Sequence, residues 1–121
     1  MTDHRTELPD LFEEMIAASD EVCEAIASHN ASRRVAIERL RRGDDLRSIV
    51  DDSPLAANLE RTRAAMAELD TARGRIRSAV MRALLDEGMT KREIAQRWGV
   101  SPQLVSRYTA DGPRKLRQRT R

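Results

Sequence analysis

The sequence has few of the residues on which several classes of site depend. Its 121 residues include one cysteine, Cys23, and two histidines, His4 and His29. Zinc sites need clusters of these residues and disulfide frameworks need paired cysteines, so we expect no metal and no cofactor. A Gly-rich phosphate loop, a nucleophile elbow and an acid/base dyad are also lacking, so the sequence predicts no enzyme.

Aromatic residues and long apolar runs are equally scarce. Phe, Tyr and Trp make up 2% of the chain, although 40% of its residues are hydrophobic. Strands draw on aromatic and β-branched residues, so this composition favours packed helices and predicts an all-α fold. The first ten residues carry both charge signs without an apolar leader, and no stretch approaches the about 20 apolar residues of a membrane helix. We therefore expect a cytoplasmic protein without a membrane partner.

Charge is distributed unevenly along the chain. Residues 1–70 hold nine Arg and 16 Asp or Glu, for a net charge of −7, whereas residues 71–121 hold 13 Arg or Lys and four Asp or Glu, for +9. A basic end of this kind indicates nucleic acid, and the acidic end indicates a separate partner. Lysine occurs only at Lys91 and Lys115, an arginine bias typical of a GC-rich bacterial genome.

The first helix is predicted from apolar residues that recur at steps of three and four from Leu8. It is expected to begin near Pro9 or Asp10. Residues 28–32 hold polar side chains that compete with helical hydrogen bonding, and they offer either a kink or a new N-cap. Cys23 lies on the apolar face and is expected to be buried as a small hydrophobic residue.

Two breaks are predicted after this helix. Gly43, which follows two arginines, is a helix stop. Asp44 is expected to cap a short helix that includes Val50. Ser53 is expected to cap the next helix, with Pro54 as its first residue.

The next helix, expected from Pro54 to about Glu87, has a strict four-three alternation of residues that are apolar except for Thr62 and Arg73. The positions are Leu55, Leu59, Thr62, Met66, Leu69, Arg73, Ile76, Val80 and Ala83. This heptad pattern is typical of a coiled coil. The pattern either faces a second copy or packs within the chain. On the first alternative, the dimer or partner surface comprises Leu55, Leu59, Met66 and Leu69.

Two short helices joined by a tight corner are predicted in the last third of the chain. Thr90 and Glu93 form a capping box that starts a helix over 91–98. Gly99 supplies a left-handed turn, and Ser101 caps the third helix. The expected core of this three-helix domain comprises Ile94, Trp98, Val100, Leu104, Val105 and Tyr108, together with Val80, Met81, Leu84 and Leu85.

This region resembles the helix-turn-helix of bacterial DNA-binding proteins. The run TKREIAQRWGVSPQLVSRY carries the small residue, the glycine and the branched aliphatic residue of that family at Ala95, Gly99 and Val105. It is similar to the C-terminal DNA-reading heads of serine recombinases and to region 4 of sigma factors, whereas residues 1–70 resemble no family. The resemblance implies double-stranded DNA as the ligand.

In this family the N-terminal part of the third helix enters the major groove. The resemblance therefore implies base contacts from Ser101, Pro102, Gln103, Ser106 and Arg107. Glutamine suits adenine, and arginine suits guanine or phosphate. Phosphate contacts are expected from Lys91, Arg92, Arg97, Arg114, Lys115 and Arg117.

We therefore expect a helical dimerisation or partner-binding region over 1–73, a helix-turn-helix domain over 74–112 and a basic disordered tail over 113–121. The leading hypothesis is a homodimeric, sequence-specific transcriptional regulator associated with the nucleoid, because one motif contacts too few base pairs for specificity. A plasmid-partition or nucleoid-organising protein is an alternative. Another is a protein-binding adaptor or antitoxin that acts through the acidic half and binds DNA secondarily.

Overall fold

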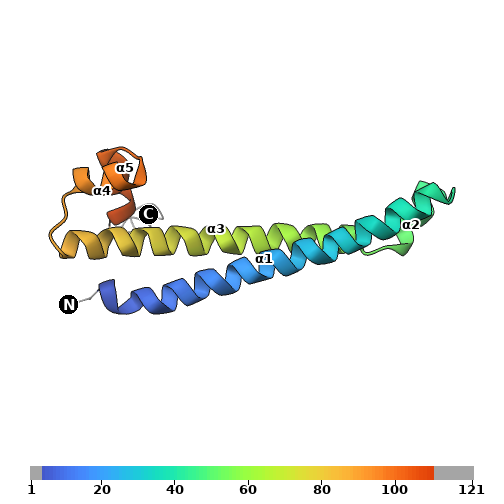
Figure 1. Cartoon of the computed structure of the whole chain (residues 1–121), viewed down its shortest axis with the longest axis horizontal. Helices are drawn as coiled ribbons and strands as arrows, with labels where there is room; N and C mark the ends of the chain where they lie inside the picture. The colour runs from blue at the N-terminus through green and yellow to red at the C-terminus, as the bar shows by residue number, and fades with distance from the viewer. Residues whose placement is uncertain (1–3, 111–121) are drawn as a thin grey trace, which may run out of the picture. The chain divides into compact units, whose positions relative to one another are not determined.

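The computed structural model describes residues 4–110, which form α-helices and no strand (Figure 1). The helices are α1 (His4–Arg41), α2 (Leu46–Asp52), α3 (Leu55–Asp86), α4 (Lys91–Trp98) and α5 (Pro102–Thr109). The predicted fold, a long N-terminal helical hairpin followed by a three-helix domain, is confirmed. None of these helices combines the length and apolar character of a membrane span.

The chain divides into two compact units. The hairpin unit comprises Glu13–Arg73, and the C-terminal unit comprises the chain up to Phe12 together with the chain from Gly74 onward. Helices α1 and α3 contribute residues to both units. The predicted domain boundaries stay a prediction, and the tail over 113–121 lies outside the described residues.

Helix α1 begins earlier than the sequence indicates. The predicted start at residue 9 or 10 is wrong, because the helix begins at His4 and Pro9 lies inside it. Proline costs the helix an amide hydrogen bond. The turn before it has partners far along the chain: His4 Nδ1 lies 2.8 Å from Asp86 Oδ2, and the Arg5 guanidinium donates to Glu87 Oε2 at 2.8 Å. A local sequence pattern does not contain these contacts.

The same helix continues without a break through residues 28–32. The Ser32 hydroxyl donates to the Ser28 carbonyl at 3.4 Å, one turn earlier, so this side chain bonds within the helix rather than ending it. The helix stops at Arg41, as predicted. Gly43 has a φ of 94°, and its amide donates to the Leu40 carbonyl at 3.0 Å.

The predicted cap of α2 is wrong by one residue. Asp45 is the N-cap: its carboxylate accepts from the Ser48 amide at 3.3 Å and from the Ser48 hydroxyl at 2.7 Å. These hydrogen bonds lower the pKa of Asp45. Asp44 instead accepts from Arg39 at 2.8 Å and from Arg42 at 3.0 Å, and both arginines lower its pKa.

The start of α3 also differs by one residue from the prediction. The helix begins at Leu55, and the Pro54 carbonyl accepts from the Asn58 amide at 2.8 Å, so Pro54 precedes the helix rather than opening it. The Ser53 hydroxyl is buried without a hydrogen-bond partner, so it does not cap α3. The other end is close to the predicted one, since α3 ends at Asp86 and Gly88 follows with a φ of 101°.

In the hairpin unit, α1 and α3 pack through small residues. Ala25 of α1 and Ala65 and Ala72 of α3 are buried. Beside them the Asn58 side-chain amide donates to the Ser32 hydroxyl at 2.6 Å. Because the distance between packed helices depends on side-chain size, alanines at the contact let the backbones approach closely.

Helix α3 has the predicted four-three alternation, but α1 covers an adjacent stripe of it. The buried positions are Ala65 and Ala72, whereas Leu59 and Met66 are 48% and 53% exposed. Of the four residues expected on a dimer or partner surface, these two lie exposed, and the other two, Leu55 and Leu69, are half-buried.

One flank of the hairpin unit is held by charge pairs. The Arg61 guanidinium donates to both carboxylate oxygens of Glu21, at 2.9 and 3.0 Å, and to the Ser28 hydroxyl at 3.2 Å. The hydrogen bond from Arg61 lowers the pKa of Glu21. The helical repeat places Leu59 and Met66 on the flank away from this pair.

The C-terminal unit has a compact apolar core. Met81, Ile94, Ala95 and Val105 are buried at its centre, and the half-buried residues around them are Leu84, Leu85, Met89, Val100 and Tyr108. Most of the predicted core is thereby confirmed. Trp98, the last residue of α4, is an exception: it is 40% exposed. Val80 and Leu104 are half-buried outside the cluster.

We expect Ile94→Ala to destabilise the C-terminal unit by about 2–5 kcal/mol, because it empties a fully buried site. The matched control is Gln96→Ala on the exposed side of the same helix, which should change stability by less than about 0.5 kcal/mol. Urea denaturation followed by the fluorescence of Trp98, the chain's single tryptophan, measures both. Equal midpoints would contradict the assigned core.

Candidate nucleic-acid interface

A reciprocal capping box starts α4, as the sequence predicts. The Glu93 amide donates to the Thr90 hydroxyl at 3.1 Å, and the Thr90 amide donates to Glu93 Oε1 at 2.9 Å. The hydrogen bond from the Thr90 amide to the carboxylate is the largest cause of the lowered pKa of Glu93, and the Thr90 side chain is the next largest. Two amide groups at the helix start are thereby satisfied, which fixes where α4 begins.

A three-residue corner joins α4 to α5. Gly99 adopts the left-handed conformation, with φ 70° and ψ 34°, and both its amide and that of Val100 donate to the Ala95 carbonyl. Ser101 is the N-cap of α5 and accepts from the Leu104 amide at 3.1 Å, while Pro102 is the first residue of that helix. Both predicted caps and the predicted turn are confirmed.

The two short helices are fixed to each other by small and branched residues. Ala95 on α4 is 3% exposed, and Val105 on α5 is fully buried in the same cluster. Alanine leaves room for the second helix, and valine fills the angle between the helices. This arrangement turns the opposite side of α5 toward solvent.

The residues predicted to contact bases gather at the start of α5 and one turn further on. Ser101, Pro102, Gln103 and Arg107 are exposed, and Ser106 is half-buried. The structure therefore brings them onto one short helix whose N-terminal turn is accessible. Their contacts with DNA stay a prediction.

The residues predicted to contact phosphate are only partly described. Lys91, Arg92 and Arg97 are exposed on α4, and the Arg97 guanidinium donates to the Glu93 carbonyl at 3.3 Å. The other three, Arg114, Lys115 and Arg117, lie outside the described residues. The described part of the prediction thus provides cations on the helix before the corner.

Two arginines of α3 that the sequence did not single out hold the end of α5. The Arg82 guanidinium donates to the Ala110 carbonyl at 2.6 Å and to the Thr109 carbonyl at 3.4 Å. The Arg77 guanidinium lies over the Tyr108 ring, 3.9 Å from its centroid. A cation at a helix C-terminus is favourable. The sequence signal was the cluster of arginines before the motif, but their spacing does not reveal which carbonyl each one meets.

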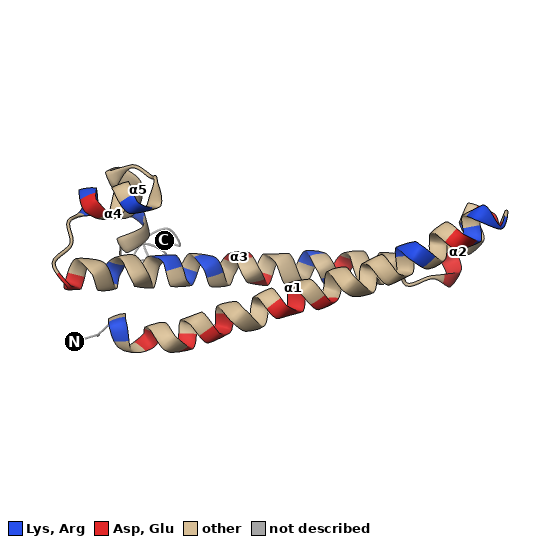
Figure 2. Ribbon diagram, viewed as in Figure 1, with Lys and Arg blue, Asp and Glu red and all other residues tan. Residues whose placement is uncertain are grey.

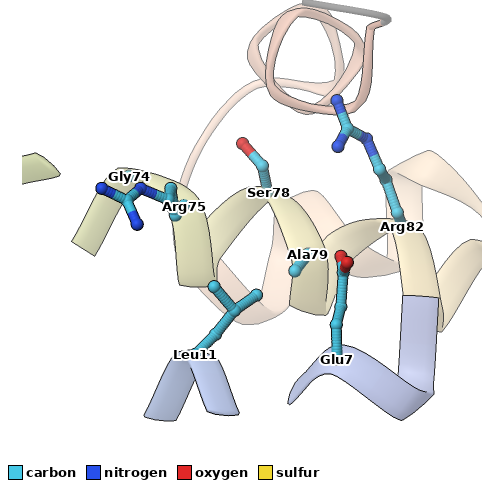
Figure 3. Close-up of a pocket in the computed structure, with 7 residues that line it drawn as sticks. All are labelled: Glu7, Leu11, Gly74, Arg75, Ser78, Ala79 and Arg82. Atoms are coloured by element: carbon cyan, nitrogen blue, oxygen red, sulfur yellow. The ribbon is translucent and has the colours of Figure 1, made fainter. Parts of the chain in front are cut away.

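A pocket of about 370 Å³ lies within the C-terminal unit, between the start of α1 and α3 (Figure 3). Its lining comprises Glu7, Leu11, Gly74, Arg75, Ser78, Ala79 and Arg82. Glu7 and Leu11 point toward α3, whereas the side chains of Ser78 and Arg82 point away from α1. Its polar groups therefore do not converge on one point, as those of a ligand site would.

Comparison with known proteins supports the same region as the functional one. A sequence model of the family described as a homeodomain-like domain matches residues 71–117. The match supports a helix-turn-helix protein of the DNA-binding kind, and it begins within α3 rather than at α4. Neither a search of curated proteins nor a search of solved structures found a match to this chain. Bacterial origin and the similarity to serine recombinases and sigma factors stay predictions.

The capping box predicts a pH dependence that one substitution can isolate. The pKa of Glu93 is lower in the folded protein, so its stabilising effect is complete above the unfolded-state pKa and is lost as the pH falls through the folded-state pKa. Glu93→Gln keeps an acceptor for the Thr90 amide but does not titrate. Thermal unfolding at pH 7 and pH 4, followed by Trp98 fluorescence, should show a larger loss of Tm in the natural protein than in the variant. An equal loss would contradict the role of Glu93.

Proposed function

Because the C-terminal unit contains a helix-turn-helix, we propose that this protein is a sequence-specific transcriptional regulator that binds double-stranded DNA as a homodimer. The observation that carries the proposal is the accessible start of α5, capped by Ser101 and fixed to a buried core through Val105. A helix held in this way enters the major groove as a rigid body.

The proposal divides the exposed residues into two roles. Gln103 and Arg107 read bases, because an amide pairs with the edge of adenine and a guanidinium with that of guanine. Lys91, Arg92 and Arg97 contact phosphates, which fixes the position of the protein without reading sequence.

Six further residues have roles in the proposed complex with DNA. Ser101 and Pro102 stand at the start of α5, and the half-buried Ser106 lies one turn further along, where each adds a short-range contact to a base edge. The basic residues Arg114, Lys115 and Arg117 are assigned to phosphate from the sequence alone.

The homodimer follows from the small footprint of a single motif. One recognition helix contacts too few base pairs for a regulatory site, so two half-sites about one helical turn apart are required. The exposure of Leu59 and Met66 in the hairpin unit supports an apolar surface through which two copies associate.

Substitutions in α4 and α5 should separate base reading from phosphate binding. Gln103→Ala or Arg107→Ala should cost about 1–3 kcal/mol on a preferred duplex selected from a random pool and relax the preference there. Arg92→Ala should weaken binding to every duplex and reduce the salt slope by about one. Titrations of preferred and scrambled duplexes at several salt concentrations measure both effects.

The same titrations test the proposal against its nearest alternative. If the random pool yields no preferred duplex while binding stays strongly salt-dependent, the protein is a nucleoid-organising protein rather than a regulator. If the α4 and α5 variants behave identically on both duplexes, the division of roles is wrong.

The proposed homodimer predicts a concentration-dependent mass. The natural protein should sediment as a dimer at micromolar concentration, and Met66→Glu should shift it toward the monomer because a charge then enters an apolar contact. The matched control is Ala64→Glu, an exposed position of the same helix turned away from that flank. Sedimentation of the natural protein as a monomer would remove the homodimer from the proposal.

A further inference from the structure

Helix α1 carries a second apolar stripe, which the hairpin does not cover. Ile16, Ile26 and Ile37 are 59%, 41% and 45% exposed. Cys23, expected to be buried, is exposed on the same stripe, so that expectation is wrong. We call these residues, with the half-exposed Leu40, the outer stripe. They occupy positions of one heptad face, on which the intervening positions hold the polar residues Ser19, Asn30 and Arg33.

The outer stripe is distinct from the face that α1 turns toward α3. That inward face comprises Ala25, His29 and Ser32, all of them buried. The buried hydrophobic residues of the hairpin unit are Ala25, Ile49, Ala65 and Ala72, which contribute a single large side chain. Several of the larger apolar side chains of this unit therefore lie outside its own core, as they do in surfaces that bind another protein.

Helix α3 extends the same apolar surface. Leu59 and Met66 are exposed on the flank away from the Arg61–Glu21 pair. The pair occupies the other flank, where α1 and α3 meet through charges. In the hairpin unit one flank is thus closed by ion pairs, and the other is apolar and uncovered.

The charges of α1 are divided between its two halves (Figure 2). Within the hairpin unit, residues 13–27 hold five acidic residues and no basic one, whereas residues 28–41 hold four arginines and one glutamate. A second α1 helix running in the same direction would place like charges opposite each other. One running in the opposite direction would place acidic residues opposite arginines.

The spacing of the apolar residues has the same symmetry. Ile26 lies ten residues after Ile16 and eleven before Ile37, so the centre of that pair falls between Ile26 and the next residue. In an antiparallel pair of α1 helices in which Ile16 meets Ile37 of the other copy, the two Ile26 residues therefore lie beside each other across the axis, offset by one residue. Isologous contacts about a two-fold axis have this reciprocity.

The charged residues beside the stripe fit this register as well. Glu13 and Asp20 lie one heptad apart in the acidic half, and Arg34 and Arg41 lie one heptad apart in the basic half, all of them exposed. When Ile16 faces Ile37 of the other copy, Asp20 comes within one residue of Arg34, and Glu13 within one residue of Arg41. Apolar spacing and charge order thus favour the same antiparallel pairing to within one residue along the helix.

We propose that the outer stripe of α1 binds the outer stripe of a second copy, antiparallel, with a two-fold axis near Ile26. The proposal rests on the homodimer of the proposed function and adds its face and its direction. The order of charged and apolar residues along the outer stripe is complementary to itself, which favours a second copy over a protein of unrelated sequence.

Disulfide crosslinking tests the direction of the pair. In a Cys23→Ser background, Ile26→Cys should give a crosslinked dimer under mild oxidation, because its two copies face each other and disulfides need Cα atoms within about 7 Å. Ile16→Cys alone and Ile37→Cys alone should not crosslink. An equal mixture of these two variants, after the subunits have exchanged, should give the crosslinked dimer.

The outcomes separate this inference from the proposed function. Crosslinking of Ile16→Cys and of Ile37→Cys each with itself would show a parallel pair and overturn the inference. A dimer by sedimentation in which the Ile26→Cys variant does not crosslink would also overturn it while keeping the homodimer. A monomer by sedimentation would remove both.

Charge reversal gives a second test that does not depend on oxidation. Glu13→Lys with Asp20→Lys should weaken the dimer about tenfold, and so should Arg34→Glu with Arg41→Glu, because exposed pairs contribute little individually but add when several are reversed. All four changes in one chain should restore dimerisation. The control Ala17→Lys, exposed on another side of α1, should leave the dimer constant unchanged. Failure of the fourfold variant to recover would contradict the register.

Discussion

The burial of Val105 against Ala95 and Ile94 is the constraint on which the rest of the C-terminal unit depends. It requires a sharp corner, which Gly99 supplies with a positive φ, and a small residue on the facing helix. With the inner side of α5 committed to the core, its opposite side has no role in stability. Exposed polar side chains that are not part of the core are available to bind another molecule.

The helices of the two units pack through side chains of different size. In the C-terminal unit a fully buried Met81 and Ile94 form a core of large side chains. In the hairpin unit alanines bring α1 and α3 close, and Arg61 clamps their flank to Glu21. Hydrophobic stabilisation scales with the apolar area buried, so the hairpin unit gains less from its own core than its apolar content would allow.

The parts of this fold that the sequence predicted are those governed by local chemistry. The capping box of Thr90 and Glu93, the Gly99 turn and the Ser101 cap were all predicted in place, because each depends on residues within one turn. The caps of α2 and α3 were each wrong by one residue, whereas the early start of α1 has a distant cause. His4 meets Asp86, so α1 begins before Pro9.

The candidate site shows the same limit. Exposure of Gln103 and Arg107 follows from the helical repeat and the position of the core, and it was predictable. The contact of Arg82 with the Ala110 carbonyl was not, because a surface arginine has no sequence signal for its partner. The four-three pattern of α3 likewise did not determine which of two adjacent stripes packs within the chain. The structure shows that Ala65 is buried and Met66 is exposed.

Because α1 and α3 pack closely through alanines, the effect of replacing an alanine in the hairpin unit depends on its position in the helix. Ala64 and Ala65 are neighbours in the chain, yet the first is exposed and the second is 4% exposed. A larger side chain at the first position extends into water, whereas at the second it pushes α1 away and strains the contact. The effect of random substitutions in α3 on stability would therefore repeat every seven residues. The same substitution would have little effect on one side of the helix and a severe effect on the other.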